Sequence, residues 1–351
     1  MTSLYIHIPF CKKKCDYCSF YSLTDDYKEE YVSALIRAVQ KHGGKTLKSI
    51  YIGGGTPSVL SPRQIHRITD AVYKYNHTDG CLEFTVECNP ESISGEFIKA
   101  SGADRVSMGF QSFCDDELKT IGRLHGADDC KRAVDICRQS GIKNISGDLI
   151  FALPRQTLLS LESSVNGILS LGIEHISAYN LQLESGTPIT RLSRYVADED
   201  TQAKMYYTLC DMLKSAGYTH YEISNFAKDG FRAVHNSVYW QGGDYIGLGP
   251  SAHSKIGSVR YFFDADIHKF INGSFEFDGC EEIADPIFEK IMLGLRTDAG
   301  VDLSLLKNSD KFIKQIVGAG FATKNDGRLM LTDRGFYLSN TIIAEITARE
   351  C

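Results

Sequence analysis

The chain has 351 residues and a mass of 39.0 kDa, with 43% hydrophobic and 23% charged residues. This length corresponds to about two domains and excludes collagen-like folds and small disulfide frameworks. No segment approaches the ~18 consecutive apolar residues of a membrane-spanning helix, and the net charge of −6 argues against a nucleic-acid partner.

The first half alternates β-branched and aromatic runs with helical patterns, which is typical of βαβ units and a parallel sheet. Strands are predicted at residues 4–8, 49–52, 82–87, 105–110, 144–150 and 175–181. Helices are predicted at residues 27–39, 61–75, 91–100, 127–140 and 158–171, with glycine stops at Gly102, Gly141 and Gly172. Because right-handed crossovers keep consecutive parallel strands adjacent, these units predict an α/β fold, a partial (β/α)6 barrel over residues 1–184.

The pattern changes after residue 184. A break at 185–188, a helix at 199–216 and a glycine- and aromatic-rich stretch at 230–257 predict an extension that covers residues 185–280. Amphipathic runs at 287–295, 301–306 and 311–318, a hairpin near 327–332 and a last helix at 333–349 resemble a winged-helix-like module over residues 281–351. The acidic balance favours a packing or partner role for this module over DNA binding.

Cysteine usage indicates a metal centre. The chain has 11 cysteines, an odd number, and its start lacks the basic and apolar segments of an export signal, so we expect a cytoplasmic protein with free thiols. Cys11, Cys15 and Cys18 form a CxxxCxxC motif just after the first predicted strand. Three thiolates can hold three irons of a cubane cluster and leave the fourth iron open. The alternatives are chance crowding or zinc, although structural zinc normally takes four ligands and no second pair lies nearby.

Polar or flexible residues follow several of the predicted strands. The glycines of 53–55 would let the backbone approach a ligand, with amides that can meet a carboxylate or an amine-bearing head group. Glu87, Gln111, Arg123 and Asp148 lie at or beyond later strand ends, where barrel active sites lie. Taken alone, each of these features is as often a turn, a salt bridge or a solvated side chain as it is part of a ligand site.

The motifs at 5–10, 11–18 and 53–57 resemble those of a radical S-adenosylmethionine (SAM) protein, and those at 87–90, 109–112 and 148–150 resemble the oxygen-independent coproporphyrinogen oxidase group. The resemblance runs over nearly the whole chain. It implies that Cys11, Cys15 and Cys18 bind a [4Fe–4S] cluster whose open iron is capped by the amino and carboxylate groups of SAM. It also implies that the amino-acid end of SAM is held by Gly54, Gly55 and Thr56, with Glu87 and Arg123 placed for polar contacts. The remainder of SAM would be contacted by Tyr5, Tyr17, Gln111 and Asp148, of which Asp148 suits a ribose hydroxyl.

Three features resemble the HemW-type haem chaperones within that group. Position 20 is Phe20 where the oxidases carry a further cysteine, and only four residues precede Tyr5. The third feature is an HNxxYW motif made of His235, Asn236, Tyr239 and Trp240. A neutral imidazole can ligate haem iron and aromatic rings can stack on a porphyrin, whereas without the resemblance such a motif is more often core packing.

The leading hypothesis is therefore a haem-binding protein that delivers haem to an acceptor protein, with the cluster and SAM governing assembly or release. The rival is a radical enzyme that oxidises coproporphyrinogen or attacks another tetrapyrrole. A third reading is a cluster-bearing interaction protein unrelated to tetrapyrroles. Lys12, Lys13 and Lys14 would suit an acidic electron donor such as a flavodoxin, although adjacent lysines are more often a solvated loop.

Overall fold

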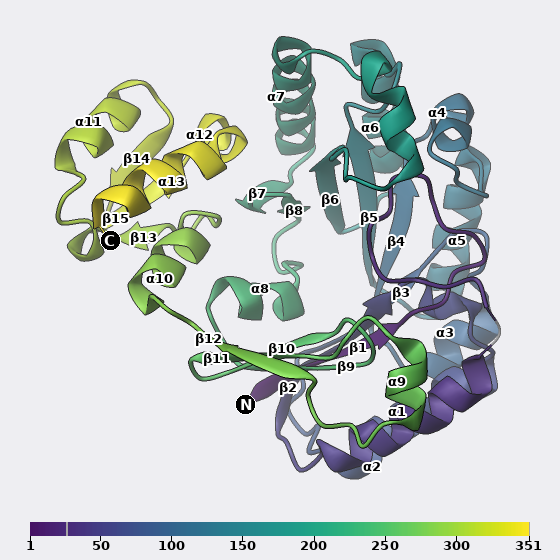
Figure 1. Ribbon diagram of the computed structural model, residues 1–351. Helices are drawn as coiled ribbons and strands as arrows, with labels where there is room; N and C mark the ends of the chain where they lie inside the picture. Colours follow the sequence, from purple (N-terminus) through teal and green to yellow (C-terminus); the bar gives the residue numbers. More distant parts are fainter. Residues whose placement is uncertain (26, 351) are drawn as a thin grey trace.

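The protein is described here by a computed structural model that covers residues 1–25 and 27–350. Among these residues, twelve strands form one curved sheet in the order β12-β11-β10-β9-β1-β2-β3-β4-β5-β6-β8-β7 (Figure 1). The six central strands are parallel and follow the chain order: β1 Thr2–Ile8, β2 Leu47–Gly54, β3 Glu83–Cys88, β4 Arg105–Gln111, β5 Asn144–Phe151 and β6 His175–Asn180. The sheet curves without closing, which confirms the predicted partial barrel.

Helices cover the outer, convex face of this sheet (Figure 1). They are α1 Lys28–Lys41, α2 Pro62–Tyr75, α3 Gly95–Ser101, α4 Asp115–Thr120, α5 Ala127–Gln139, α6 Leu158–Ser170 and α7 Glu199–Ser215, with short 3-10 helices η1 Pro57–Val59 and η2 Pro188–Tyr195. Alternation along β1 shows how the two faces differ. Leu4, Ile6 and Ile8 are buried in the main hydrophobic core, while the alternate positions Ser3 and His7 are polar and form side-chain hydrogen bonds. The barrel interior is therefore lined with polar groups.

Two helix predictions need correction. The helix expected at 91–100 begins only at Gly95, because Ser94 caps it by accepting a hydrogen bond from the Phe97 amide. The residues before it form a turn in which the amides of Ser92 and Ile93 donate to the Asn89 carbonyl. Helix α4 was not predicted, since six residues with three acidic side chains in the first turn carry little apolar periodicity.

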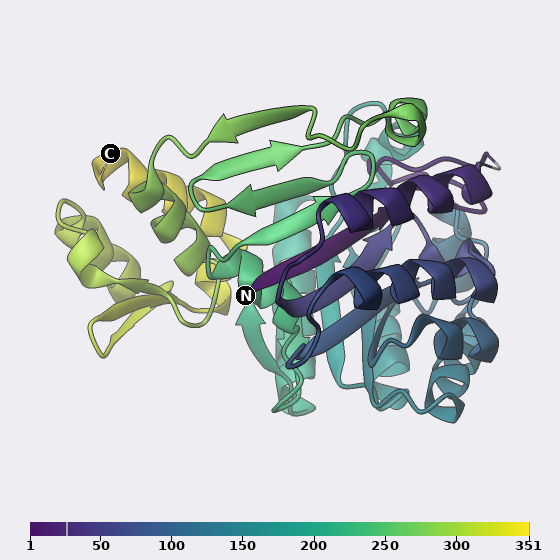
Figure 2. The ribbon, with the colours of Figure 1, turned by 90° about the horizontal axis from the view of Figure 1, so that it is seen from below.

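The extension adds strands to both edges of the sheet, which the sequence pattern did not indicate. On one side β9 Tyr245–Leu248 pairs parallel to β1, and the antiparallel strands β10 His253–Ile256, β11 Val259–Phe262 and β12 Gly279–Glu282 continue the sheet (Figure 2). On the other side lie β8 Asn225–Ala227 and β7 Thr219–Glu222, both antiparallel to their neighbours. Helix α9 Ile267–Asn272 packs on α1, while α8 Val234–Trp240 lies across the amino-terminal ends of β2 and β3.

The C-terminal segment has its own hydrophobic core, built on Ile291, Ile313, Leu329 and Ile346. It comprises α10 Pro286–Gly294, β13 Val301–Asp302, η3 Leu303–Leu305, α11 Asp310–Gly318, β14 Ala322–Asn325, β15 Arg328–Leu331, α12 Asp333–Tyr337 and α13 Ser339–Glu350, with a sheet order of β13-β15-β14. The run at 301–306 is thus a strand and a 3-10 turn, and the predicted last helix is interrupted at Leu338. The proposed boundaries at residues 184 and 280 stay predictions. None of the helices in the described residues is long and apolar enough to cross a membrane.

Asp333 joins this C-terminal module to the barrel. Its carboxylate accepts a hydrogen bond from His220 Nδ1 at 2.9 Å and pairs with Lys214. Burial opposes ionisation, but the His220 hydrogen bond and the Lys214 charge outweigh it and lower the pKa of Asp333. A carboxyl whose pKa is lowered by folding stabilises the protein at pH values above its unfolded-state pKa of about 4. This stabilisation is lost as the pH falls through the folded-state pKa.

We expect Asp333→Asn to lower the free energy of unfolding by about 1–2 kcal/mol at pH 7. The difference from wild type should shrink in acid, because the wild-type carboxylate is then protonated. Denaturant titrations at pH 7 and at about pH 2, well below the unfolded-state pKa of the carboxyl, would measure this, with Asp310→Asn on the exposed start of α11 as the control. An equal loss at both pH values would rule out the charged contact as the cause.

Candidate functional site

The three motif cysteines lie on the loop that follows β1, at the carboxyl edge of the parallel strands. The ends of the loop are held together, because the Cys11 amide donates to the Leu23 carbonyl and the Leu23 amide donates to the Pro9 carbonyl. Cys11, Cys15 and Cys18 are free, half-buried thiols that line one cavity of about 440 Å³. Burial raises the pKa of Cys11 and of Cys18, and the nearby charge of Cys15 raises both further. The fold therefore gathers the three sulfurs into one site.

Two polar side chains donate to these sulfurs. Thr56 Oγ1 lies 3.4 Å from Cys11 Sγ, and Arg123 Nη1 lies 3.4 Å from Cys15 Sγ. Asn89 joins the two donors, because its Nδ2 donates to Thr56 Oγ1 at 3.1 Å and its Oδ1 accepts from Arg123 Nη2 at 2.9 Å. Hydrogen bonds of this kind stabilise thiolates and tune iron–sulfur clusters.

The glycine-rich segment packs against the cysteine loop. Gly54 has a φ of +113°, and a Cβ there would come within 2.5 Å of the His7 ring, so only glycine fits this position. The amides are already used: Gly54 N donates to Glu87 Oε2 at 2.9 Å, Gly55 N to the Ile8 carbonyl and Thr56 N to the Phe10 carbonyl. The expected role of these amides towards a ligand is therefore wrong for this conformation. Carbonyl oxygens, which accept from an amine, are what the segment can offer.

Glu87, Gln111 and Asp148 reach the same cavity from the ends of β3, β4 and β5. Burial raises the pKa of Glu87, although Tyr51 OH donates to it at 2.6 Å and the Gly54 amide also binds it. Burial and the nearby Glu87 charge raise the pKa of Asp148 to about 7. Gln111 has a φ of +68°, a left-handed conformation whose cost of about 1 kcal/mol is typical of functional positions.

Of the nine predicted SAM contacts, all but Tyr5 line this cavity in the described residues: Tyr17, Gly54, Gly55, Thr56, Glu87, Gln111, Arg123 and Asp148. Tyr5 lies deeper in the barrel, where its hydroxyl is 3.0 Å from His7 Nδ1. Asn89 and Tyr179 also line the cavity and were not selected from the sequence. Their positions near the ends of β3 and β6 were the available signal.

The HNxxYW motif lies at the opposite end of the barrel, on α8. His235 is 1% exposed, and both of its ring nitrogens have partners: Nδ1 is 2.9 Å from Ser49 Oγ and Nε2 is 2.7 Å from Tyr239 OH. Burial lowers the pKa of His235 to about 3, which keeps the ring neutral. Asn236 and Trp240 are half-buried, and Trp240 lines a second cavity outside the barrel. Iron ligation by His235 would require these hydrogen bonds to break, so its axial role stays a prediction.

The side chains at the carboxyl edge of the parallel strands fit the cofactors that the sequence implied. Three thiols supply three corners of a cubane cluster and leave one open. Arg123 Nε is buried and has no hydrogen-bond partner in the described part of the chain, so a polar donor faces the cavity unsatisfied. Asp148 adds a carboxyl that can accept from hydroxyls. The cavity therefore has sulfur ligands at one side and polar groups for a small, charged molecule at the other.

Comparison with known proteins is consistent with this geometry. Residues 5–166 match the profile of the radical SAM superfamily, and residues 284–338 match that of the HemN C-terminal domain. The chain is 35% identical to the heme chaperone HemW of Lactococcus lactis, covering 97% of this chain and 96% of that protein. It is also 35% identical to the heme chaperone HemW of Bacillus subtilis, covering 97% and 98%. The predicted resemblance is confirmed.

Among solved structures, the chain resembles the radical SAM coproporphyrinogen III oxidase HemN from Escherichia coli. The TM-score is 0.85 over 98% of this chain and 89% of that one, at 19% sequence identity. At this identity the likeness establishes the fold. The partial barrel and its C-terminal module are thus shared by the two proteins.

Proposed function

This chain belongs to the HemW family within the radical SAM superfamily, and from that premise we propose that it binds haem and delivers it to an acceptor protein. The observation that carries the proposal is identity over almost the full length to proteins named heme chaperones. Free thiols at the site suit the reducing conditions of the cytoplasm, where we propose that the protein acts.

We assign Cys11, Cys15 and Cys18 as ligands of a [4Fe–4S] cluster with SAM beside it. When bound, this pair supplies one-electron chemistry at the sulfonium of SAM. Arg123 and Thr56 hold Cys15 and Cys11 through hydrogen bonds to sulfur. The carbonyls near Gly54 would receive the amine of SAM, and Asp148 its ribose hydroxyls. Tyr17 packs on an apolar cluster that contains Ile121 and Ile189 and keeps water from that wall.

The cysteine loop also offers a docking surface for a reductant. Lys12, Lys13 and Lys14 are exposed, and Lys13 and Lys14 lie at the cavity that contains the cysteines. Three cations beside a redox site attract an acidic partner and accelerate encounter at low salt. We propose a flavodoxin-type electron donor for this surface.

We expect anaerobically purified, cluster-containing protein to bind one haemin per chain, with a shifted Soret band, and then to lose the haem to an apo-acceptor. Coproporphyrinogen should not be converted to protoporphyrinogen under the same conditions. Absorbance titration and product chromatography on one preparation would measure both. An unchanged haemin spectrum together with 5′-deoxyadenosine and protoporphyrinogen formation would replace this proposal with the rival, a coproporphyrinogen-oxidising enzyme.

A further inference from the structure

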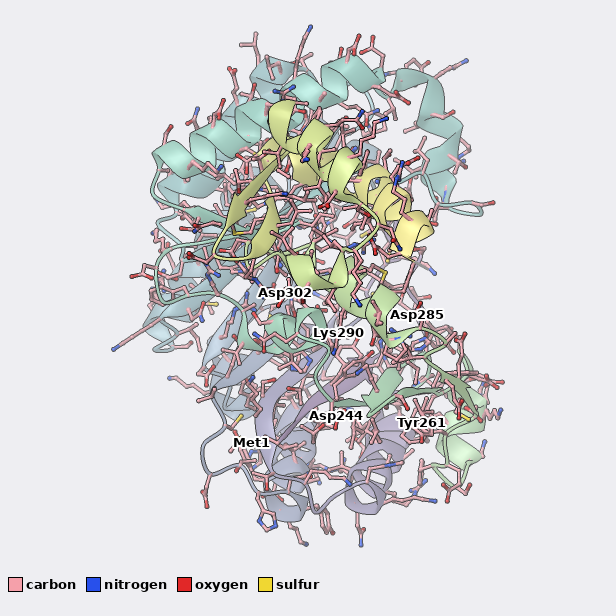
Figure 3. The ribbon with its side chains drawn as sticks, turned by 90° about the vertical axis from the view of Figure 1, so that its left-hand side faces the viewer. Met1, Asp244, Tyr261, Asp285, Lys290 and Asp302 are labelled. Atoms are coloured by element: carbon pink, nitrogen blue, oxygen red, sulfur yellow. The ribbon has the colours of Figure 1, made fainter. Side chains whose placement is uncertain are left out.

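The cavity that Trp240 lines is a cleft of about 600 Å³ between the barrel and the C-terminal module. Helix α8 and the turn between β10 and β11 form one wall, and α10 and β13 form the other. Figure 3 views the molecule from this side, with Lys290 and Asp302 on the module where it approaches the barrel. A volume in this range suits one large organic ligand.

The walls of the cleft are suited to a flat apolar ring. Trp240, the single tryptophan of the chain, lines the cleft from α8, and Leu293 and Leu305 line it from the module. The Trp240 side chain is half-buried, yet it has no ring contact or hydrogen bond with any described residue. An indole that is sheltered from water but unpartnered leaves its face available for stacking.

The cleft also carries cations that could receive carboxylates. Arg232 is paired with Asp298, and Lys255 donates to the Gly242 carbonyl at 2.8 Å and lies 4.0 Å from Glu289. Arg328, which also lines the cleft, donates to the Ala299 and Gly300 carbonyls. Lys290 is exposed and has no partner in the described part of the chain. The acidic groups of the lining are Glu289, Asp298 and Asp302, of which Glu289 pairs with Arg260 and Asp298 with Arg232. Lys290 is thus the cation most available to an anionic ligand.

We infer that this cleft is the seat of the tetrapyrrole cargo, with Trp240 stacked on the macrocycle and Lys290 bound to a propionate. This inference rests on the proposed haem-delivery function and adds the location at which haem binds. No histidine, cysteine or methionine lines the cleft in the described residues, and the Tyr221 hydroxyl, which does line it, is already hydrogen-bonded to His175 Nε2 at 2.8 Å. The seat therefore holds the ring and its carboxylates and leaves an iron face open, so that an acceptor can ligate the iron before the haem leaves.

The cleft proposed for haem lies apart from the cavity proposed for the cluster and SAM. Its lining shares no residue with the cavity of the cysteine loop, and the two lie at opposite ends of the parallel strands. The motif residue His235 faces the barrel interior behind α8, away from the cleft that Trp240 lines. Haem and SAM would then bind without competing for space.

Haemin titration of the cluster-containing protein tests this seat. We expect Trp240→Ala to raise the haemin Kd about tenfold, Trp240→Phe to restore most of the affinity, and Lys290→Glu to raise the Kd about fivefold, less at high salt. Lys311→Glu, the same charge change on the exposed surface of α11, should leave the Kd unchanged. His235→Gln, which keeps hydrogen-bonding capacity but cannot replace an imidazole on iron, tests the alternative placement, in which the predicted axial ligand His235 holds the iron.

The outcomes distinguish an error in the location of the haem site from an error in the proposed function. If wild type binds haemin and both cleft variants bind it equally well, the seat is wrong while the haem-delivery proposal survives. Loss of binding in His235→Gln alone would move the cargo to the barrel interior and also overturn the seat. Failure of wild type to bind haemin would overturn the proposed function, and the seat with it.

Discussion

Replacing Cys15 with serine is expected to abolish the [4Fe–4S] cluster in protein reconstituted without oxygen. The loop supplies three sulfurs for four irons, so each sulfur holds one corner alone. Cys88 also lines the cavity, but it is 2% exposed on β3 and belongs to the main hydrophobic core, so it cannot take the place of Cys15. Cys15 also accepts the hydrogen bond from Arg123 Nη1, so the substitution disturbs the contact of that nitrogen, while Nη2 keeps Asn89 Oδ1 and the Gly109 carbonyl. We therefore expect iron per chain to fall from about four to well below one.

Iron and sulfide analysis, with visible absorption and electron paramagnetic resonance spectra, would measure the loss. Cys280→Ser provides a matched control, because Cys280 is an exposed free thiol on β12, far along the sheet order from the loop after β1. It should keep the wild-type iron content. A Cys15→Ser protein that retains four irons and an unchanged spectrum would show that the triad does not hold the cluster, and zinc bound in wild type would show that the metal was misassigned.

The barrel could be predicted from sequence because its signals are local. Each unit combines a short β-branched run with an amphipathic helix, and the helices stop at left-handed glycines such as Gly102 and Gly141. The strands that extend the sheet carry no comparable signal. Strand β9 pairs with β1 although more than 200 residues separate them, and pairing over that distance depends on tertiary packing.

Much of the candidate cofactor site was predictable for a related reason. Carboxyl ends of parallel strands meet at one edge, so residues in the carboxyl-terminal halves of strands, such as Glu87 on β3 and Asp148 on β5, converge there. What sequence could not supply was the direction of individual groups. The Gly55 amide is used by Ile8, and Tyr5 turns towards His7 instead of the cavity.

The HNxxYW motif illustrates the limit of pattern reading. Its residues lie on one short helix, which the sequence pattern did not indicate. Nor did the pattern indicate that His235 would meet Ser49, 186 residues earlier in the chain. That contact turns the imidazole inward, together with backbone hydrogen bonds from Val234 and His235 to buried Glu83. The same helix therefore closes the amino-terminal end of the barrel with one side and presents Trp240 to the cleft with another.

The second large effect concerns Asp148, for which we expect Asp148→Asn to weaken SAM binding about 30-fold at pH 8. Ribose hydroxyls donate to a carboxylate more strongly than to an amide, by roughly 2 kcal/mol for a buried charged acceptor. The asparagine is close in size to the aspartate, so the cavity keeps its shape. Equilibrium dialysis with labelled SAM on cluster-containing protein would measure the two dissociation constants.

The same carboxyl should make SAM affinity depend on pH. In the empty site burial raises the pKa of Asp148 to about 7, so the group is mostly protonated at pH 6 and mostly ionised at pH 8. Bound hydroxyl donors favour the ionised form, and affinity must therefore rise with pH, by about tenfold from pH 6 to pH 8. Asp148→Asn should flatten this profile. If the profile persists in that variant, the titrating group is instead Glu87, whose pKa burial also raises.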